Sequence, residues 1–159
     1  MRFGFVVARF NEFITRRLFD AAVSELQAMG AHPEDMEVIW VPGAMEVPLA
    51  CRRLAETGRV DTVLAIACVL KGETPHFDLV SAELARGVST VALACDLPVI
   101  FGAITAFDLE QAIQRAGGKY GNRGSDAARA AVEMVHLYRQ LGGAHSEVQT
   151  RLRAINTHA

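Results

Sequence analysis

The sequence predicts an α/β fold, a three-layer sandwich in which a four-stranded parallel sheet is covered by helices on both faces. Short runs of β-branched and aromatic residues alternate along the chain with longer segments of helical period. The run at 60–70 (VDTVLAIACVL) is apolar on both faces, as a central parallel strand requires. Parallel strands are joined by crossover connections, and helical crossovers place helices on both faces of the sheet.

The first two strand–helix units are expected before residue 60. Residues 2–8 (RFGFVVA) form the first strand, and residues 14–26 then repeat apolar side chains at the i, i+4 spacing of an amphipathic helix. Gly30 is in position to cap that helix. Residues 36–41 (MEVIWV) form the second strand, and a turn leads into a second helix that ends near Gly58.

Two more units follow the central strand. Thr74 is the expected N-cap of the third helix, with Pro75 in the first helical position, where its missing N–H costs nothing. Residues 98–105 (PVIFGAIT) form the fourth strand. Asp108 precedes Gln111 by three residues, which is a capping-box pattern that opens a short helix.

The last part of the chain is expected to hold one long helix. Residues 117–124 (GGKYGNRG) are a glycine-rich loop, after which Ser125 caps a helix that reaches about Leu141. The expected domain therefore covers residues 1–141. Residues 142–159 are expected to form a polar, loose tail.

Composition narrows the class of protein. Of the 159 residues, 51% are hydrophobic and 21% charged, the balance of a globular domain rather than a disordered chain. The net charge of −2 gives no global attraction to nucleic acid or anionic membranes. The first residues lack the pattern of a signal peptide, and no run is long enough to cross a bilayer. Cys51, Cys68 and Cys95 lie apart in apolar runs, which favours free thiols in the cytoplasm.

Chemically useful side chains follow the predicted strands. In parallel sheets, ligands bind beyond the carboxyl ends of the strands, so these positions share one rim. The polar and aromatic residues at this rim are Arg9, Phe10, Asn11, Glu46, Lys71, Glu73, Thr74, His76, Phe101 and Thr105. Such a rim suits a small, flat ligand that carries hydroxyl or phosphate groups.

His76 is the most informative residue of this set. An imidazole can take up a proton and return it near neutral pH, as general acid–base chemistry requires. The alternative is an ordinary exposed histidine in the first turn of a helix. The neighbouring Gly72, Glu73 and Thr74 favour function, because backbone N–H groups and a hydroxyl at a helix N-terminus can bind an anion.

The other candidates each keep a structural alternative. Phe10 is either a stacking platform for an aromatic ring or a core residue, and Glu46 is either an acceptor for substrate hydroxyls or a first-turn acid. Cys68 lies inside an apolar strand, where an inert thiol is favoured over a nucleophile. Arg115 and Arg123, with Lys119 between them, are either a cationic site or a solvated basic face.

Two phosphate-binding motifs are excluded. Lys119 is followed by Tyr120 rather than by Ser or Thr, so the glycine-rich loop is not a Walker P-loop. The chain contains no GxGxxG motif of a dinucleotide-binding site. The segment RFNEFIT after the first strand also differs from a flavodoxin phosphate loop, and VLKGE lacks the phosphoryl-accepting Asp of a response regulator.

Five segments in order resemble the lumazine synthase family: ARFNEFIT, VPGAMEVP, KGETPHFDLV, PVIFGAIT and QAIQRAGGKYGNRGSDAARAAVEM. The resemblance covers residues 3–141 and implies a flavodoxin-like fold. It also implies a transferase of riboflavin biosynthesis that uses no metal and no organic cofactor. The implied penultimate step joins 5-amino-6-(D-ribitylamino)uracil to 3,4-dihydroxy-2-butanone 4-phosphate, giving 6,7-dimethyl-8-ribityllumazine, phosphate and water.

The resemblance also implies roles for individual residues. His76 matches the proton carrier, Phe10 the stacking aromatic and Arg115 the arginine that faces the phosphate, while Phe101 is expected to come from a neighbouring subunit. The family's lysine is replaced by Arg123, which keeps the charge. The full set of implied substrate-binding residues is Phe10, Asn11, Ala44, Met45, Glu46, Cys68, Val69, Leu70, Glu73, Thr74, Phe101, Arg115 and Arg123.

Partners follow from the same resemblance. The family forms pentamers, twelve of which close into an icosahedral capsid in many members, and riboflavin synthase is a candidate partner. A pentamer and a shell both remain open for this chain. The rival hypothesis is a non-catalytic shell-forming or flavin- or lumazine-binding protein. The presence of Phe10, His76 and Arg115 favours the enzyme.

Overall fold

The structure, a computed structural model, describes the backbone of residues 1–156 and the side chains of residues 1–142. Its main sheet has four strands, all parallel, in the order β2-β1-β3-β5. These strands are β1 (Phe3–Ala8), β2 (Met36–Val41), β3 (Thr62–Ile66) and β5 (Val99–Phe101). The predicted four-stranded parallel sheet is therefore confirmed.

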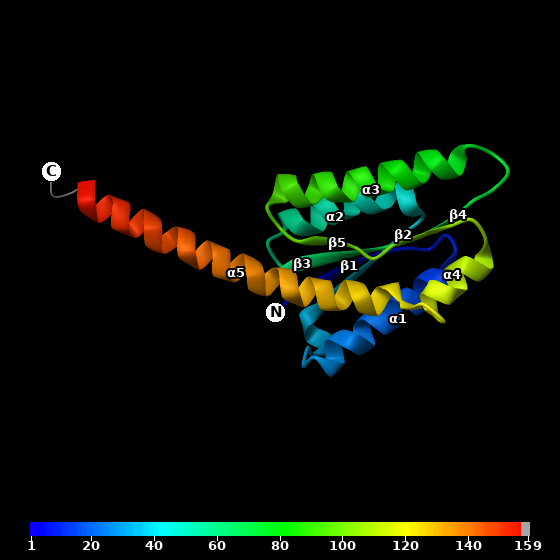
Figure 1. Ribbon diagram of the computed structural model, residues 1–159, viewed down its shortest axis with the longest axis horizontal. Helices are drawn as coiled ribbons and strands as arrows, with labels where there is room; N and C mark the ends of the chain where they lie inside the picture. Colours follow the sequence, from blue (N-terminus) through cyan, green and yellow to red (C-terminus); the bar gives the residue numbers. More distant parts are fainter. Residues whose placement is uncertain (157–159) are drawn as a thin grey trace.

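Helices cover both faces of the sheet (Figure 1). One face carries α2 (Val47–Glu56) and α3 (His76–Cys95), and the other carries α1 (Glu12–Ala28) and α5 (Arg123–Asn156). A short helix, α4 (Leu109–Arg115), lies at the end of the sheet where the strands terminate, on the same side as the loop that leads into α3. Two 3-10 turns, η1 (Pro33–Asp35) and η2 (Ala44–Glu46), flank β2. The three-layer α/β sandwich is confirmed.

The sheet has an apolar core on each face because its strands alternate their side chains. Phe3, Phe5 and Val7 pack with Leu18 on the α1 and α5 side, whereas Val6 packs on the α2 and α3 side. All five side chains are at most 2% exposed. Burial of each such side chain stabilises the fold by about 1.5–3 kcal/mol, so the two cores hold the strand ends in place.

Two of the predicted strands are interrupted. The run at 60–70 gives β3 and then β4 (Cys68–Leu70), and the run at 98–105 gives β5 and then β6 (Ile104–Ala106). Backbone bonds continue across the break, since the Gly102 N–H donates to the Ala65 carbonyl at 3.0 Å. The break at Gly102 is tight, because a Cβ there would lie 2.8 Å from Ile66 Cδ1. Beyond it, β4 pairs with β6 as a separate parallel ladder.

Some helix caps are as predicted. Gly30 has a φ of 93° and ends α1, with the Ala31 N–H donating to the Leu26 carbonyl at 3.0 Å. Asp108 Oδ1 accepts the N–H of Gln111 at 2.7 Å and so caps α4. At Gly30 and Asp108, the residues close by in the sequence were therefore enough to predict the helix cap.

The start of α3 differs from the prediction. The cap position is Pro75 rather than Thr74, and the helix begins at His76 without a side-chain cap. The Pro75 carbonyl accepts the N–H groups of Asp78 and Leu79 at 3.1 and 3.4 Å. Thr74 is thereby left in the preceding loop, two residues before His76.

The start of α5 also differs. The predicted cap Ser125 lies inside the helix and donates its hydroxyl to the Ala21 carbonyl on α1 at 3.4 Å. Asn122 Oδ1 instead accepts the Gly124 N–H at 2.8 Å. The glycine-rich segment before it forms a small antiparallel hairpin, β7 (Ala116–Gly118) and β8 (Gly121–Asn122), rather than an open loop.

The backbone of α5 does not end at Leu141. It stays helical to Asn156, and in Figure 1 its last part extends beyond the sheet and the other helices. The segment after Gly143 contains Ala, Glu, Gln, Arg and Leu but no proline, which explains why helix can continue there. Residues 157–159 of the predicted tail lie outside the described residues. Within the described part, no helix is both long and apolar enough to cross a bilayer.

Candidate functional site

A cavity of about 410 Å³ lies at the carboxyl-terminal edge of the strands. The segments after β1 and β2, the strand β4 and the loop into α3 together form its walls. The predicted site residues that line it are Phe10, Asn11, Ala44, Met45, Glu46, Cys68, Val69, Leu70, Thr74 and His76. The structure thus brings together residues that are up to 66 positions apart in the sequence, from Phe10 to His76.

Phe10 forms one wall and is not a core residue. Its side chain is 72% exposed, which removes the core interpretation. Its backbone is fixed, because the N–H groups of Arg9 and Phe10 donate to the Val41 and Pro42 carbonyls at 2.8 and 3.0 Å. An aromatic face held open at a cavity edge is suited to stacking on a flat ring.

Asn11 connects this wall to β4, which forms the floor of the cavity. It adopts a left-handed conformation with φ 58°, and its side-chain Nδ2 donates to the Cys68 carbonyl at 2.8 Å. Asparagine tolerates this backbone region better than most residues. The bond therefore ties the turn after β1 to the first residue of β4.

The floor is β4, whose Cys68 and Val69 side chains are buried. Burial raises the pKa of the Cys68 thiol to about 11, so the thiol is protonated at neutral pH. A protonated, buried thiol is a poor nucleophile, which supports the interpretation of Cys68 as an inert residue. Only its backbone groups are then left to contact a ligand. Burial similarly raises the pKa of Cys51, outside the cavity, to about 12.

A third wall is the 3-10 turn after β2. Met45 is 50% exposed and Glu46 is also exposed, while Val47 is fully buried under the turn. The Glu46 N–H donates to the Gly43 carbonyl at 3.3 Å, which closes the turn. The Glu46 carboxylate on this wall can accept hydrogen bonds from a hydroxylated chain.

The last wall is the loop of residues 71–75 and the first turn of α3. Gly72, Thr74 and His76 line the cavity, whereas Glu73 does not. His76 is the first residue of α3 and is exposed. An imidazole, a hydroxyl and a glycine backbone at a helix start can bind an anion and move a proton.

Three other predicted residues do not line the cavity of the single chain. Phe101 ends β5 with its side chain 43% exposed. Arg115 ends α4, where its Nη1 donates to the Gln111 carbonyl at 3.0 Å and its guanidinium lies 5.3 Å from the ring centroid of Tyr120. Arg123 begins α5. The structure therefore separates these residues from the cavity walls.

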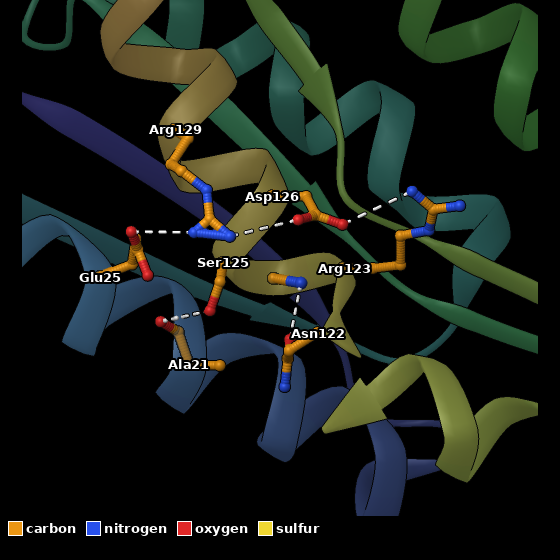
Figure 2. A network of polar contacts seen from close by, with 8 residues as sticks. Ala21, Glu25, Asn122, Arg123, Ser125, Asp126 and Arg129 are labelled. Carbon is orange, nitrogen blue, oxygen red and sulfur yellow. Dashed lines mark hydrogen bonds and ion pairs between the residues drawn. The ribbon is translucent and has the colours of Figure 1, made fainter. Parts of the chain in front are cut away.

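Arg123 belongs to a polar network between α1 and α5 (Figure 2). Asp126 lies between two arginines, at 3.5 Å from Arg123 and 3.4 Å from Arg129. Arg129 also pairs with Glu25 of α1 at 2.9 Å. Exposed pairs of this kind contribute little to stability.

Four lining residues fall outside the predicted set of catalytic and substrate-binding residues: Gly43, Gly72, Phe77 and Val80. Phe77 and Val80 belong to the apolar face of α3, a pattern that is typical of core packing. Val80 is buried and Phe77 half-buried, so both pack inward and still reach the cavity. The sequence indicates Gly72, with Glu73 and Thr74, as a candidate anion-binding group at this helix start.

The chemical groups around the cavity define what it can do. They include an aromatic face, a carboxylate, an imidazole and backbone groups at a helix start. Among the described residues, no group of three or more His, Cys, Asp or Glu side chains is arranged to hold a metal ion.

Comparison with protein families agrees with this arrangement. The family model described as 6,7-dimethyl-8-ribityllumazine synthase matches residues 1–139. The matched span contains every lining residue of the cavity and also Phe101, Arg115 and Arg123.

Proposed function

The chain belongs to the 6,7-dimethyl-8-ribityllumazine synthase family, and we propose that it catalyses the reaction of that name. The substrates are 5-amino-6-(D-ribitylamino)uracil and 3,4-dihydroxy-2-butanone 4-phosphate. The products are 6,7-dimethyl-8-ribityllumazine, phosphate and water. One observation carries this proposal: Phe10, Glu46 and His76, each suited to a different part of these substrates, line a single cavity.

The pyrimidine ring binds between Phe10 and β4. Phe10 offers an exposed face for stacking, and Val69 and Leu70 line the same cavity. The Cys68 carbonyl already accepts a hydrogen bond from the Asn11 side-chain amide. The hydrogen bonds to the edge of the ring therefore come from the later residues of β4, Val69 and Leu70. The ribityl chain then extends along Ala44, Met45 and Glu46, where the Glu46 carboxylate accepts hydrogen bonds from its hydroxyls.

The phosphate of the second substrate binds at the start of α3. Gly72 and Thr74 offer a backbone N–H and a hydroxyl at the positive end of a 20-residue helix. Glu73 lies outside the lining, which keeps its carboxylate from the cavity wall. The phosphate also needs a cation, and arginine suits this role because its planar fork binds phosphate in a bidentate way.

A neighbouring subunit supplies the missing groups. Arg115, Arg123 and Phe101 lie outside the cavity of one chain, and Phe101 keeps 43% of its side chain exposed. We propose that these residues complete the cavity of an adjacent copy in a pentamer. Association of twelve such pentamers into a capsid, and of riboflavin synthase with it, are further parts of this proposal.

His76 carries protons during the reaction. The substrate amine attacks the ketone carbon of the butanone phosphate and water leaves, which gives an imine. Loss of phosphate and closure of the second ring by another loss of water follow, and each step moves a proton. His76 lies at the same helix start as the proposed phosphate site, so it can donate to the departing oxygen and accept from carbon. Holding both substrates in one cavity removes a further part of the barrier.

The three free cysteines add a proposal on location. Cys51 and Cys68 are buried thiols and Cys95 is partly buried. Thiols of this kind persist in a reducing compartment, which favours the cytoplasm.

The direct test mixes the purified protein with both substrates and follows lumazine formation by absorbance above the uncatalysed background. His76→Ala is expected to slow turnover, and Arg115→Ala is expected to raise the KM for the butanone phosphate. Arg52→Ala, on the exposed side of α2, is the control. Background turnover by a folded, oligomeric wild type would refute the enzyme and favour a flavin- or lumazine-binding shell protein.

A further inference from the structure

Lys71 and Phe107 make a contact next to the cavity that the proposed roles do not use. Lys71 begins the loop after β4, and Phe107 follows β6. The Lys71 Nζ lies 5.1 Å from the centroid of the Phe107 ring, within range of a cation–π interaction. The two segments are also joined by their backbones, because the Lys71 N–H donates to the Ala106 carbonyl at 2.9 Å.

The same ring contacts the other end of the loop. The Phe107 and Phe77 rings have centroids 6.2 Å apart and are tilted by 41°, which is an attractive aromatic pair. Phe77 follows His76 in the first turn of α3 and lines the cavity. Phe107 therefore contacts both Lys71, just before the loop segment 72–75, and Phe77, just after His76.

Phe107 is not a core residue. Its side chain is 64% exposed, so burial does not explain its place. Its backbone is well anchored, because the Phe107 N–H donates to Gln111 Oε1 at 3.1 Å and Asp108 caps the same helix. A ring on a fixed helix start can hold a loop, while a ring on a loose segment cannot.

We propose that Lys71 and Phe107 are positioning residues that hold the loop of residues 71–75 in the conformation that binds the phosphate-bearing substrate. This inference rests on the proposed function. Neither residue lines the cavity, so both act through Gly72, Thr74 and His76. Lys71 pairs with the ring rather than with Glu73: the ion pairs found among the described residues do not include these two side chains.

Steady-state kinetics test the mechanism through Lys71→Met, Phe107→Leu and the double variant. Each single change is expected to raise the KM for the butanone phosphate about threefold to tenfold, the effect of losing one or two contacts of this type. The KM for the ribitylaminouracil should stay within about twofold, because Phe10 and β4 are untouched. Either single change removes the Lys71–Phe107 contact, and Phe107→Leu also removes the contact with Phe77. The double variant should therefore be no more impaired than Phe107→Leu alone.

The variant Lys71→Arg helps to distinguish a positioning role of Lys71 from direct binding of the phosphate by Lys71. Lys71→Arg should restore wild-type kinetics, because a guanidinium also stacks on an aromatic face. If Lys71 instead bound the phosphate itself, Lys71→Met would raise the KM while Phe107→Leu alone left it unchanged. That result, or strict additivity in the double variant, would overturn the proposal.

Hydrogen exchange gives a measurement that does not depend on activity. The amides of residues 72–74 and 76–79 should exchange faster in Lys71→Met and Phe107→Leu than in the wild type without substrate. Arg17→Met is the matched control, because the Arg17 guanidinium lies 4.4 Å from the Phe13 ring on α1. Unchanged exchange in both loop variants would refute the positioning role. An inactive wild type with faster loop exchange in both variants would refute the proposed function alone.

Discussion

Replacement of Asn11 by alanine should destabilise the protein by about 2 kcal/mol. Asn11 combines a left-handed backbone, φ 58° and ψ 42°, with a side-chain bond of 2.8 Å to the Cys68 carbonyl. Alanine loses the bond, which contributes about 0.5–1.5 kcal/mol. It also tolerates the left-handed region less well, at a cost of up to about 1–2 kcal/mol for an ordinary residue.

Glycine at the same position separates the two costs. Asn11→Gly loses the same hydrogen bond but accepts the left-handed backbone without strain. It should therefore cost about 1 kcal/mol, roughly half of the effect of alanine. The difference between the two variants measures the backbone contribution alone.

Denaturant unfolding of the wild type and both variants at one protein concentration provides the comparison, because association shifts apparent stability. Lumazine formation by each variant reports whether the turn still holds Phe10 in place. Equal losses for glycine and alanine would show that the left-handed backbone contributes nothing. No loss in either variant would refute the role of the Asn11–Cys68 bond.

Four further outcomes are expected. Gly124→Ala should prevent normal packing of α5, because its Cβ would collide with the backbone of Leu18, and a large drop in the unfolding midpoint checks this. Asp108→Ala removes the cap of α4 and should cost about 0.5–2 kcal/mol, whereas Asp108→Asn should restore most of it. Cys68 should react slowly with iodoacetamide at pH 8 in the folded state and faster as the pH rises toward its pKa of about 11; rapid modification at pH 8 would contradict its burial. The hydrogen bond from the Arg59 guanidinium lowers the pKa of the Glu37 carboxyl. The stabilisation of the folded state by this pair is therefore present above the pKa of Glu37 in the unfolded chain, and it is lost as the pH falls through the lowered pKa of the folded state. Glu37→Gln should flatten that part of the stability–pH curve, and an unchanged curve would contradict the pairing.

Local patterns were enough for the class of fold and for much of the rim. The alternation of apolar runs and helical periods predicted the four parallel strands, because both periods follow from backbone geometry alone. Gly30 and Asp108 were predicted as caps since each acts within a few residues of itself. Phe10, Thr74 and His76 were placed at one edge because parallel strands all end on the same side.

Long-range packing decided what the patterns left open. Asn122 and Ser125 are both suitable caps, and the approach of α1 selected Asn122 by engaging the Ser125 hydroxyl with Ala21. The exposure of Phe10 and the reach of Phe77 into the cavity depend on neighbours that are distant in sequence. The contact of Lys71 with Phe107 likewise forms only when β4 pairs with β6. A sequence determines which segments become strands and helices through short-range geometry, whereas the contacts between their ends exist only once the whole sheet has assembled.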